Sequence, residues 1–596
     1  MEPDEKSSWE RFQRLKPNRK KIGKRARKLE VATLRHAHKF LIQRWTNVRE
    51  VRRHMLGWLL LVTLLIGATI LQLAWYRNSY TVETSLPGGT YAEGVVGPLD
   101  TFNPLYATTN AERSASRLLF ASLLSYDQES QLRGELAESW GMAKDGEKYT
   151  VTLRKDATWH DGQPITSKDV AFTLGLIKNP EVRSPLRLSW ESIDVTAPND
   201  RTVVFTLPSP YAPFPHALTF GVLPEHLLKD VPVGLLRESN FNKAPVGSGP
   251  FAFRNVQTID AAEGRKVLHL RSFVGYTGGQ PKLDRFQLHI YKDPAQLRQA
   301  LVSNEVGAVS DLTAHELGRL DMKKFKVSDV AMNNGAFALF RGDSAILKDI
   351  EVRRALRLAT DTAKIRERLG GHVLPLNGPI IGAQYREVMA ISPPLHNIAQ
   401  AERILNKSGW RKNDAGIRVK KGIELSMSVI AVKSGDYPVV LEELAGQWRR
   451  IGVKVETRLV NAEDVQQSVL RPRAYDVLLY ELAIGADPDV FAYWHSSQMS
   501  QNGLNFANYS SPLVDDALES ARARNEVALR AEKYKTFTQQ WLKDVPAIAL
   551  YRPVLSYVTT QNIRAIPDDT TIVDAVDRYR MVPYWTVERG LRYTTP

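Results

Sequence analysis

The side chains best suited to hold a small ligand lie close together in one short stretch, residues 480–494. Glu481 and Asp487 carry carboxylates that could bind a cation, and Phe491 and Trp494 offer aromatic faces for stacking on an apolar side chain or a sugar. Aromatic residues near the start of a helix also serve as core residues, which is the alternative for both. The residue types in this stretch therefore indicate binding of a ligand.

No pattern in the sequence supports catalysis or a dedicated metal site. The spacing of the histidines, at His160, His289, His315 and His495, fits neither H-x-x-x-H nor H-E-x-x-H. There is no G-x-S-x-G sequence, and Ser167 and Lys168 do not belong to an S-x-x-K motif. The absence of cysteine excludes disulfides and thiolate chemistry. We therefore expect no catalytic residue, no metal and no cofactor, and a protein that is not an enzyme.

The elements that must position residues 480–494 can be predicted from hydrophobic periodicity. Alternation in 423–430 and 453–459 predicts two strands, and the apolar face formed by Leu441, Leu444 and Trp448 predicts a helix between them. A strand–helix–strand order implies a parallel crossover. The apolar run 475–480 predicts a further strand, and ligands bind beyond the carboxyl ends of strands in open α/β sheets. Loop 481–489 is therefore the candidate pocket, with an ordinary surface loop as the alternative.

A second region, residues 149–177, also has a clear local pattern. Tyr149, Val151 and Leu153 alternate as in a half-buried strand, and residues 160–163 have turn chemistry. Thr166 with Asp169 three residues later is typical of a capping box at the start of a helix.

Length and charge narrow the class of protein. At 596 residues with 43% hydrophobic content, the chain can bury at least two cores. The net charge of +15 is concentrated at the N-terminus, where residues 1–54 carry 17 Lys and Arg against 6 Asp and Glu. The rest carries 63 against 59 and shows no basic stripe, so we expect no nucleic acid partner for the large domain.

Residues 55–76 form an uncharged segment of 22 residues, enough to cross about 30 Å of hydrocarbon as a helix. Trp58 lies near one end of it, and Trp75 and Tyr76 lie at the other, as interfacial aromatics do. A cleaved signal peptide is the alternative, but about 54 residues precede the segment and no small-x-small site follows. We expect one uncleaved transmembrane helix.

The flanking charges predict the orientation of this helix. The N-terminal flank contains Arg44, Arg49, Arg52 and Arg53, whereas only Arg77 lies close on the other side. The positive-inside rule then places the N-terminus in the cytoplasm and the main domain outside, in the extracellular space or periplasm. The basic tail could serve as a topology signal, or could contact anionic lipid or RNA.

Eight segments occur in the order typical of one known family and span roughly residues 85–560. They are DTFNPLY at 100–106, LAESW at 136–140, the stretch 153–174, PVGSGPF at 245–251, VRRALRLATD at 352–361, AERILNKSGW at 401–410, WRRIGVKV at 448–455 and DPD at 487–489. Together they resemble the family 5 solute-binding proteins, the peptide, nickel and oligosaccharide receptors of ABC importers. PVGSGPF lacks the spacing of a phosphate-binding loop, so we predict a tight turn there.

The resemblance implies an α/β fold of the bilobal periplasmic-binding-protein type 2 class, with an extra subdomain and preceded here by a single transmembrane helix. It places lobe one at 78–335 plus 556–596, its extra subdomain at about 119–246, and lobe two at 336–555, after a basic tail at 1–54 and the helix at 55–76. The chain would cross between lobes near 333–335 and 551–553. Paired crossings of this kind are hinge candidates.

The resemblance also implies where a ligand would bind. Peptide receptors of the family hold the peptide amino group with an aspartate three residues before the DPD-like motif, and that position here is Ile484. A buried ammonium beside isoleucine lacks a charge partner, which weakens the prediction of a peptide with a free amino terminus. The candidate ligand-binding residues are Asp100, Asn103, Glu481, Ile484, Asp487, Phe491, Trp494 and Asn505. Asn103 and Asn505 have turn roles as the alternative.

The resulting functional hypothesis is a membrane-anchored receptor that captures a peptide or similar solute by lobe closure and delivers it to ABC permease subunits. The alternative is an interaction or assembly protein that reuses the scaffold with a changed or occluded cleft, which Ile484 and the long basic tail motivate.

Overall fold

The computed structural model describes the backbone of residues 45–567 and 570–593. By its contacts the chain divides into two compact units, Met1–Thr84 with Gly590–Pro596, and Ser85–Arg589. Most of the predicted basic tail, residues 1–44, lies outside the described residues. The predicted membrane segment lies within helix α3 (Trp45–Tyr80). Its part His54–Tyr76, with a mean hydropathy of 2.2, is long and apolar enough to cross a membrane by length and composition.

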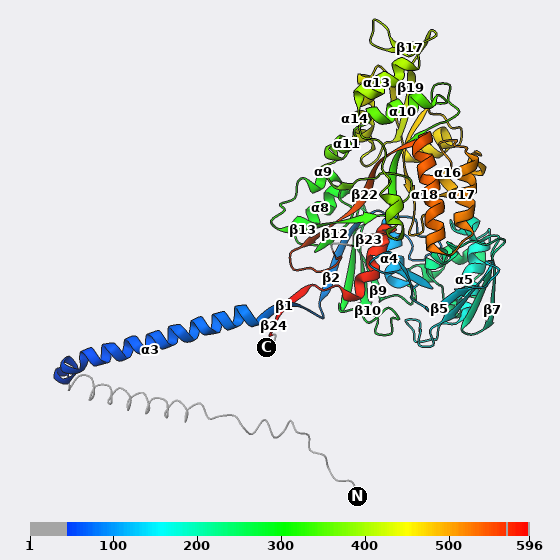
Figure 1. Cartoon of the computed structure of the whole chain (residues 1–596). Helices are drawn as coiled ribbons and strands as arrows, with labels where there is room; N and C mark the ends of the chain where they lie inside the picture. The colour runs from blue at the N-terminus through cyan, green and yellow to red at the C-terminus, as the bar shows by residue number, and fades with distance from the viewer. Residues whose placement is uncertain (1–44, 568–569, 594–596) are drawn as a thin grey trace. The chain divides into compact units, whose positions relative to one another are not determined.

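The larger unit is built on one extended mixed sheet of 13 strands (Figure 1). Its main path runs β20 (Lys454–Val460), β19 (Ser426–Val432), β21 (Val477–Ala483), β14 (Asn334–Phe340), β22 (Ala547–Thr560), β12 (Ala308–Val309), β2 (Thr90–Val96), β11 (Arg285–Tyr291), β10 (Arg265–Ser272) and β9 (Phe251–Asp260). Strands β13 (Phe325–Met332), β15 (Val373–Leu374) and β23 (Thr571–Ile572) pair beside this path. The 14-residue strand β22 belongs to both halves of the sheet.

The half of the sheet around β14 is covered on both faces. Alternate residues of β14 enter two different cores, with Ala336, Ala338 and Phe340 in one and Phe337 and Leu339 in the other. The first core also contains residues of α10 (Ile350–Ala359), α13 (Ile398–Lys407) and α14 (Tyr437–Arg450), and the second contains residues of α17 (Pro512–Arg522) and α18 (Val527–Asp544). This period of two along a strand with helices on each face defines an α/β layer structure.

The predicted strand–helix–strand unit is confirmed. Strand β19 pairs in parallel with β20, and α14 connects them. Two of the family-like segments, 352–361 and 401–410, lie largely in helices, the first in α10 with Asp349 as its N-cap and the second in α13. Gly452, which follows α14, has a φ of +89°, a conformation that terminates helices because only glycine adopts it without strain.

A second, four-stranded sheet is separate from the large one. It is visible with its helix at the lower right of Figure 1. It contains β5 (Ala137–Met142), β6 (Lys148–Leu153), β8 (Thr202–Thr206) and β7 (Asp194–Asn199), in that order. Helix α5 (Ser167–Lys178) packs on it and begins with the predicted capping box of Thr166 and Asp169. The local pattern of residues 149–177 therefore predicted both elements correctly.

The glycine-rich segment 245–251 packs tightly against the backbone at Leu119. The amides of Ser248 and Gly249 donate to the Leu119 carbonyl at 3.0 and 2.8 Å. His160 also holds this segment, because its Nδ1 accepts from the Gly247 amide at 3.1 Å and its Nε2 donates to the Gly249 carbonyl at 3.0 Å. Two of the family-like segments thus meet, and the predicted tight turn serves packing.

We expect Gly247→Ala to lower the free energy of unfolding by about 1–3 kcal/mol, because the added Cβ would lie 1.9 Å from the Leu119 carbonyl oxygen. Gly141→Ala is the matched control, since no heavy atom lies within 4 Å of its Cβ position. Urea unfolding of both variants measures the difference. Equal stability of the two would contradict the close approach.

Two chain segments connect the halves of the sheet side by side. Arg552 donates to the Met332 carbonyl at 2.6 Å and to Asn333 Oδ1 at 2.7 Å, which ties the two crossings together. No acid pairs with this guanidinium among the described residues, and burial lowers the pKa of Arg552 to about 10. The hydrophobic residues up to Met332 and those from Leu555 onward do not pack in the same clusters as the residues between them. The residues from Ala336 to Tyr551 form separate hydrophobic clusters.

Candidate functional site

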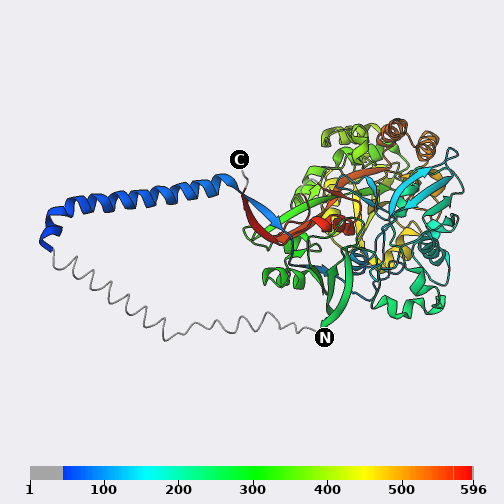
Figure 2. The same ribbon diagram turned by 90° about the horizontal axis from the view of Figure 1, so that it is seen from below.

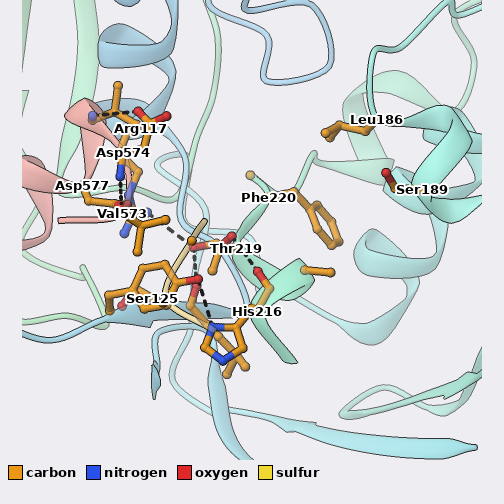
Figure 3. Close-up of a pocket in the computed structure, with 18 of the residues that line it drawn as sticks. Arg117, Ser125, Leu186, Ser189, His216, Thr219, Phe220, Val573, Asp574 and Asp577 are labelled. Carbon is orange, nitrogen blue, oxygen red and sulfur yellow. Dashed lines mark hydrogen bonds between the residues drawn. The ribbon is translucent and has the colours of Figure 1, made fainter. Parts of the chain in front are cut away.

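A cavity of about 650 Å³ lies between the two halves of the larger unit. Five separate segments line it: residues around α4 (Asn110–Leu119), segments 185–190 and 211–221, loop 484–489, and residues 573–577. Figure 3 shows that Arg117, Asp574 and Asp577 lie on one side, while Leu186, Ser189 and Phe220 lie on the other. The volume falls within the range of about 300–1,000 Å³ that is usual for ligand pockets.

Loop 484–489 is attached to the crossing between the halves. The amides of Ile484 and Gly485 both donate to the Asn333 carbonyl, at 3.0 and 3.2 Å. Gly485 has a φ of +86°, which suits this turn. A change in backbone geometry at Asn333 would therefore move one wall of the cavity.

Asp487 in this loop is neutralised by a buried arginine. Arg530 of α18 contacts it through two parallel bonds, with Nη1 to Oδ2 at 2.6 Å and Nη2 to Oδ1 at 2.5 Å. Arg530 also donates to the Tyr534 hydroxyl at 2.9 Å. Both charged side chains are more than 90% buried, so the bidentate geometry holds a charge pair away from solvent.

The other acid of the loop, Asp489, pairs with Arg522 at the end of α17, with Nε to Oδ2 at 3.0 Å. The same guanidinium lies over the rings of Phe491 and Tyr211, 4.2 and 4.9 Å from their centroids. The Ala212 amide donates to the Arg522 carbonyl at 3.0 Å. These contacts join the subdomain to helix α17, and Figures 1 and 2 both show α17 and α18, in orange, beside the subdomain, in cyan.

His216 faces the loop from η2 (Phe214–Thr219) of the subdomain. Its Nδ1 lies 3.2 Å from the Tyr126 hydroxyl, and its Nε2 lies 4.0 Å from Asp487 Oδ2. Burial lowers the pKa of His216, although the charge of Asp487 opposes this shift. The histidine is therefore neutral at neutral pH and offers a polar ring to the cavity.

The opposite wall carries two further ion pairs. Arg113 pairs with Asp574, and Arg117 contacts both oxygens of Glu135 at 3.1 and 3.0 Å. Glu135 also accepts from Ser122, and Arg117 and Ser122 lower its pKa against the opposing effect of burial. Most of the charge at the cavity is thus compensated within the protein.

Two of the eight predicted ligand-binding residues, Ile484 and Asp487, line the cavity. Asp100 is exposed and lies 3.6 Å from Lys266, Glu481 accepts from Asn334 Nδ2 at 2.8 Å, and Phe491 stacks on His495 at 4.0 Å between ring centroids. Trp494 packs in the core against Phe337 and Trp541. The lining of this cavity does not include Asp100, Glu481, Phe491 or Trp494.

The two predicted asparagines form hydrogen bonds within the protein. Asn103 donates to Asn242 Oδ1 at 2.9 Å and accepts from the Leu105 amide at 3.0 Å. Asn505 donates to the carbonyls of His495 and Tyr509 and accepts from the Tyr509 amide. Both side chains are fully buried, and their bonds stabilise turns.

The cavity also contains functional groups that the sequence interpretation missed. The main ones are Arg113, Arg117, His216, Asp574 and Asp577 on the lining, with Arg522 and Arg530 behind it. The sequence signals next to them are two capping boxes, of Thr109 with Glu112 and of Asp574 with Asp577, and these patterns indicate helix capping alone.

Glu481 of strand β21 makes the stability of the fold depend on pH. Burial raises its pKa, the bond from Asn334 opposes this, and the charge of Asp436 adds to it. The folded state therefore binds the proton of Glu481 more tightly than the unfolded state does. The stability that this proton contributes is lost as the pH rises above 4.5, the usual pKa of a glutamate.

In the variant Glu481→Gln we expect the free energy of unfolding to fall less steeply as the pH rises. At neutral pH we expect it to be about 1 kcal/mol higher than in the wild type. The amide oxygen can still accept the bond from Asn334. Urea unfolding at several values from about pH 5 to about pH 8 measures the slope. Glu456→Gln, at an exposed position of β20, is the control, and equal slopes for the two variants would contradict this account.

Comparison with known proteins agrees with this architecture. Residues 131–503 match the family described as bacterial extracellular solute-binding proteins, family 5. The chain belongs to this family. Family 5 proteins are substrate-binding receptors, and they are not a family of enzymes.

The chain is also similar to known proteins over most of its length. The oligopeptide-binding protein AppA of Bacillus subtilis is 27% identical over 488 residues, which are 78% of this chain and 86% of that protein. The structure of NikZ from Campylobacter jejuni in complex with Ni(L-His) is similar with a TM-score of 0.66 and 26% identity, covering 83% of this chain and 99% of NikZ. The structure of AppA from Bacillus subtilis with a nonapeptide gives a TM-score of 0.63 at 23% identity, covering 84% and 99%.

These likenesses confirm the predicted bilobal type 2 fold. The cavity lies between the two halves of the larger unit. Its chemistry suits binding, because its polar groups come from both walls and its charges are held in fixed pairs.

Proposed function

We propose that this protein is a membrane-anchored extracellular receptor that captures peptides for an ABC importer. Membership of family 5 carries the receptor function, and AppA, which covers most of the chain, is named for oligopeptide binding. The cavity of about 650 Å³ with walls from both halves is the observation that supports capture in this chain. Permease subunits of the importer are the partners of such a receptor.

The proposed lobes are residues 78–335 with 556–596, which include the subdomain at about 119–246, and residues 336–555. A peptide in the cavity would contact Ile484 and Asp487 of lobe two and residues of lobe one at the same time only when the lobes are closed. Ligand binding therefore shifts the population toward the closed form. The bonds from Ile484 and Gly485 to Asn333 connect this wall to the proposed hinge.

Helix α3 is the proposed anchor, with the N-terminus in the cytoplasm and the lobes outside the cell or in the periplasm. Its segment His54–Tyr76 has the length and hydropathy for one crossing. The arginines that precede it agree with this orientation.

Native mass spectrometry of the full-length protein, purified in detergent from its membrane, tests the proposed function. We expect a noncovalent ligand with the mass of a short peptide, or capture of peptides from an added library of tri- to hexapeptides. Absence of binding in both forms of the experiment would contradict a peptide receptor. Retention of a sugar or a metal chelate would instead assign another solute to the same cleft.

The alternative, an assembly protein with an occluded cleft, finds no support in the cavity. Its volume is open to a ligand, and no large side chain from Ile484–Asp489 fills it.

A further inference from the structure

The charged residues of the cavity are compensated by partners in all cases but one among the described residues. The four compensating ion pairs are Arg113–Asp574, Arg117–Glu135, Arg522–Asp489 and Arg530–Asp487. The remaining acid on the lining is Asp577. A carboxylate without an ion pair in a ligand cavity is available to bind a cationic group of the ligand.

Asp577 has a structural role through one oxygen only. Its Oδ2 accepts from the Asp574 amide at 2.9 Å, which completes the capping box of η8 (Ala575–Tyr584). The side chain is half-buried because it faces the cavity. Figure 3 shows it beside Asp574 and Arg117 on the charged side.

Two arginines act on Asp577 through their charge, Arg580 and Arg117. Arg580 donates through Nη2 to the carbonyls of Gln128 and Thr571, while its Nε and Nη1 have no hydrogen-bond partner among the described residues, and Arg117 binds Glu135. Neither forms an ion pair with Asp577 in the described part of the chain. Burial raises the pKa of Asp577, the charge of Asp574 adds to this, and Arg580 opposes it. A cation from the ligand would supply the missing compensation.

The acids on the wall contributed by lobe two are both paired with arginines. Ile484 is apolar, both oxygens of Asp487 are bound by Arg530, and Asp489 pairs with Arg522. An ammonium that replaced Arg530 there would leave a buried guanidinium without a partner, at a cost of several kcal/mol. Asp577 on lobe one is therefore the better position for a cation.

Resting on the proposed peptide receptor, we propose that Asp577 anchors the primary ammonium group of the solute. The rest of the solute then extends toward Phe220 and Leu186 on the apolar side (Figure 3). Because Asp577 belongs to lobe one, the amine can bind before the loop of lobe two closes over it. The substrate class is a peptide with a free amino terminus, recognised by lobe one.

Two tetrapeptide libraries test the anchor with the full-length protein in detergent, one with free amino termini and one N-acetylated, with bound peptides measured by native mass spectrometry. We expect the wild-type protein to prefer the free library at least about tenfold. Asp577→Asn should abolish this preference and weaken binding of the free library about tenfold or more, because the amide keeps the capping acceptor but loses the charge.

Asp577→Ser is a second variant that keeps a capping acceptor, and Asp293→Asn is the matched control, since Asp293 caps α8 (Pro294–Val302) outside the cavity. The control should bind like the wild type. Equal binding of both libraries by the wild type, or an unchanged preference in Asp577→Asn, would overturn the anchor while leaving the peptide receptor intact. Failure of the wild type to bind either library would contradict the receptor and the anchor together.

Discussion

Replacing Arg530 with methionine should lower the free energy of unfolding by about 3–5 kcal/mol. The variant leaves the Asp487 carboxylate buried next to the cavity without either of its two short bonds from the guanidinium. The hydroxyl of Tyr534 also loses its donor. Urea unfolding at neutral pH measures the loss, with the change followed by the fluorescence of buried tryptophans such as Trp541.

The double variant Asp487→Leu with Arg530→Met is the control for this pair. Removing both charges leaves no unpaired carboxylate, so the double variant should be more stable than Arg530→Met alone. Acid should also partly rescue the single variant, because protonation removes the uncompensated charge. A single variant as stable as the wild type would show that water already screens Asp487.

Replacing Thr219 with tryptophan should weaken solute binding about 100-fold, which corresponds to about 2.7 kcal/mol. Thr219 lines the cavity, and Figure 3 places it between the charged group of Asp574 and Asp577 and the ring of Phe220. An indole at this position would occupy the space that the ligand needs between the two sides. Titration with the peptides captured by the wild type measures the change.

Thr219→Ser is the matched control, because it keeps the hydroxyl that donates to the His216 carbonyl at 3.1 Å. It should bind peptides within about threefold of the wild type, a difference below 1 kcal/mol. Unfolding of Thr219→Trp checks that the variant remains folded. Wild-type affinity in a folded Thr219→Trp protein would show that the solute binds elsewhere.

Much of the fold could be predicted because its signals are local. The alternation in β6, the capping box of Thr166 and Asp169, and the apolar faces of α10 and α14 each lie within a few residues of sequence. The order of the family-like segments then supplied the arrangement of two lobes, which local patterns alone do not contain. Family membership and the solved structures confirm this arrangement.

The site was much harder to predict, because its walls come from five segments that are far apart in the sequence. Loop 481–489 was predicted because it follows a strand, but β21 extends to Ala483, so the loop begins at Ile484. Trp494 was chosen for its ring, which in fact packs in the core, and the amides of Asn103 and Asn505 bond within the protein. Asp577 was not predicted at all; it caps η8, and its position on the cavity wall is the basis of the role that we propose for it.

The central claim, closure of two lobes on a solute, is tested most directly by the distance between the lobes. The chain contains no cysteine, so Lys144→Cys in the subdomain and Glu532→Cys on α18 provide two unique sites for spin labels at exposed positions. Pulsed electron spin resonance on the full-length protein should show a broad distribution of distances without peptide, and a shorter, narrower one with bound peptide. An identical distribution with and without bound peptide would contradict capture by lobe closure.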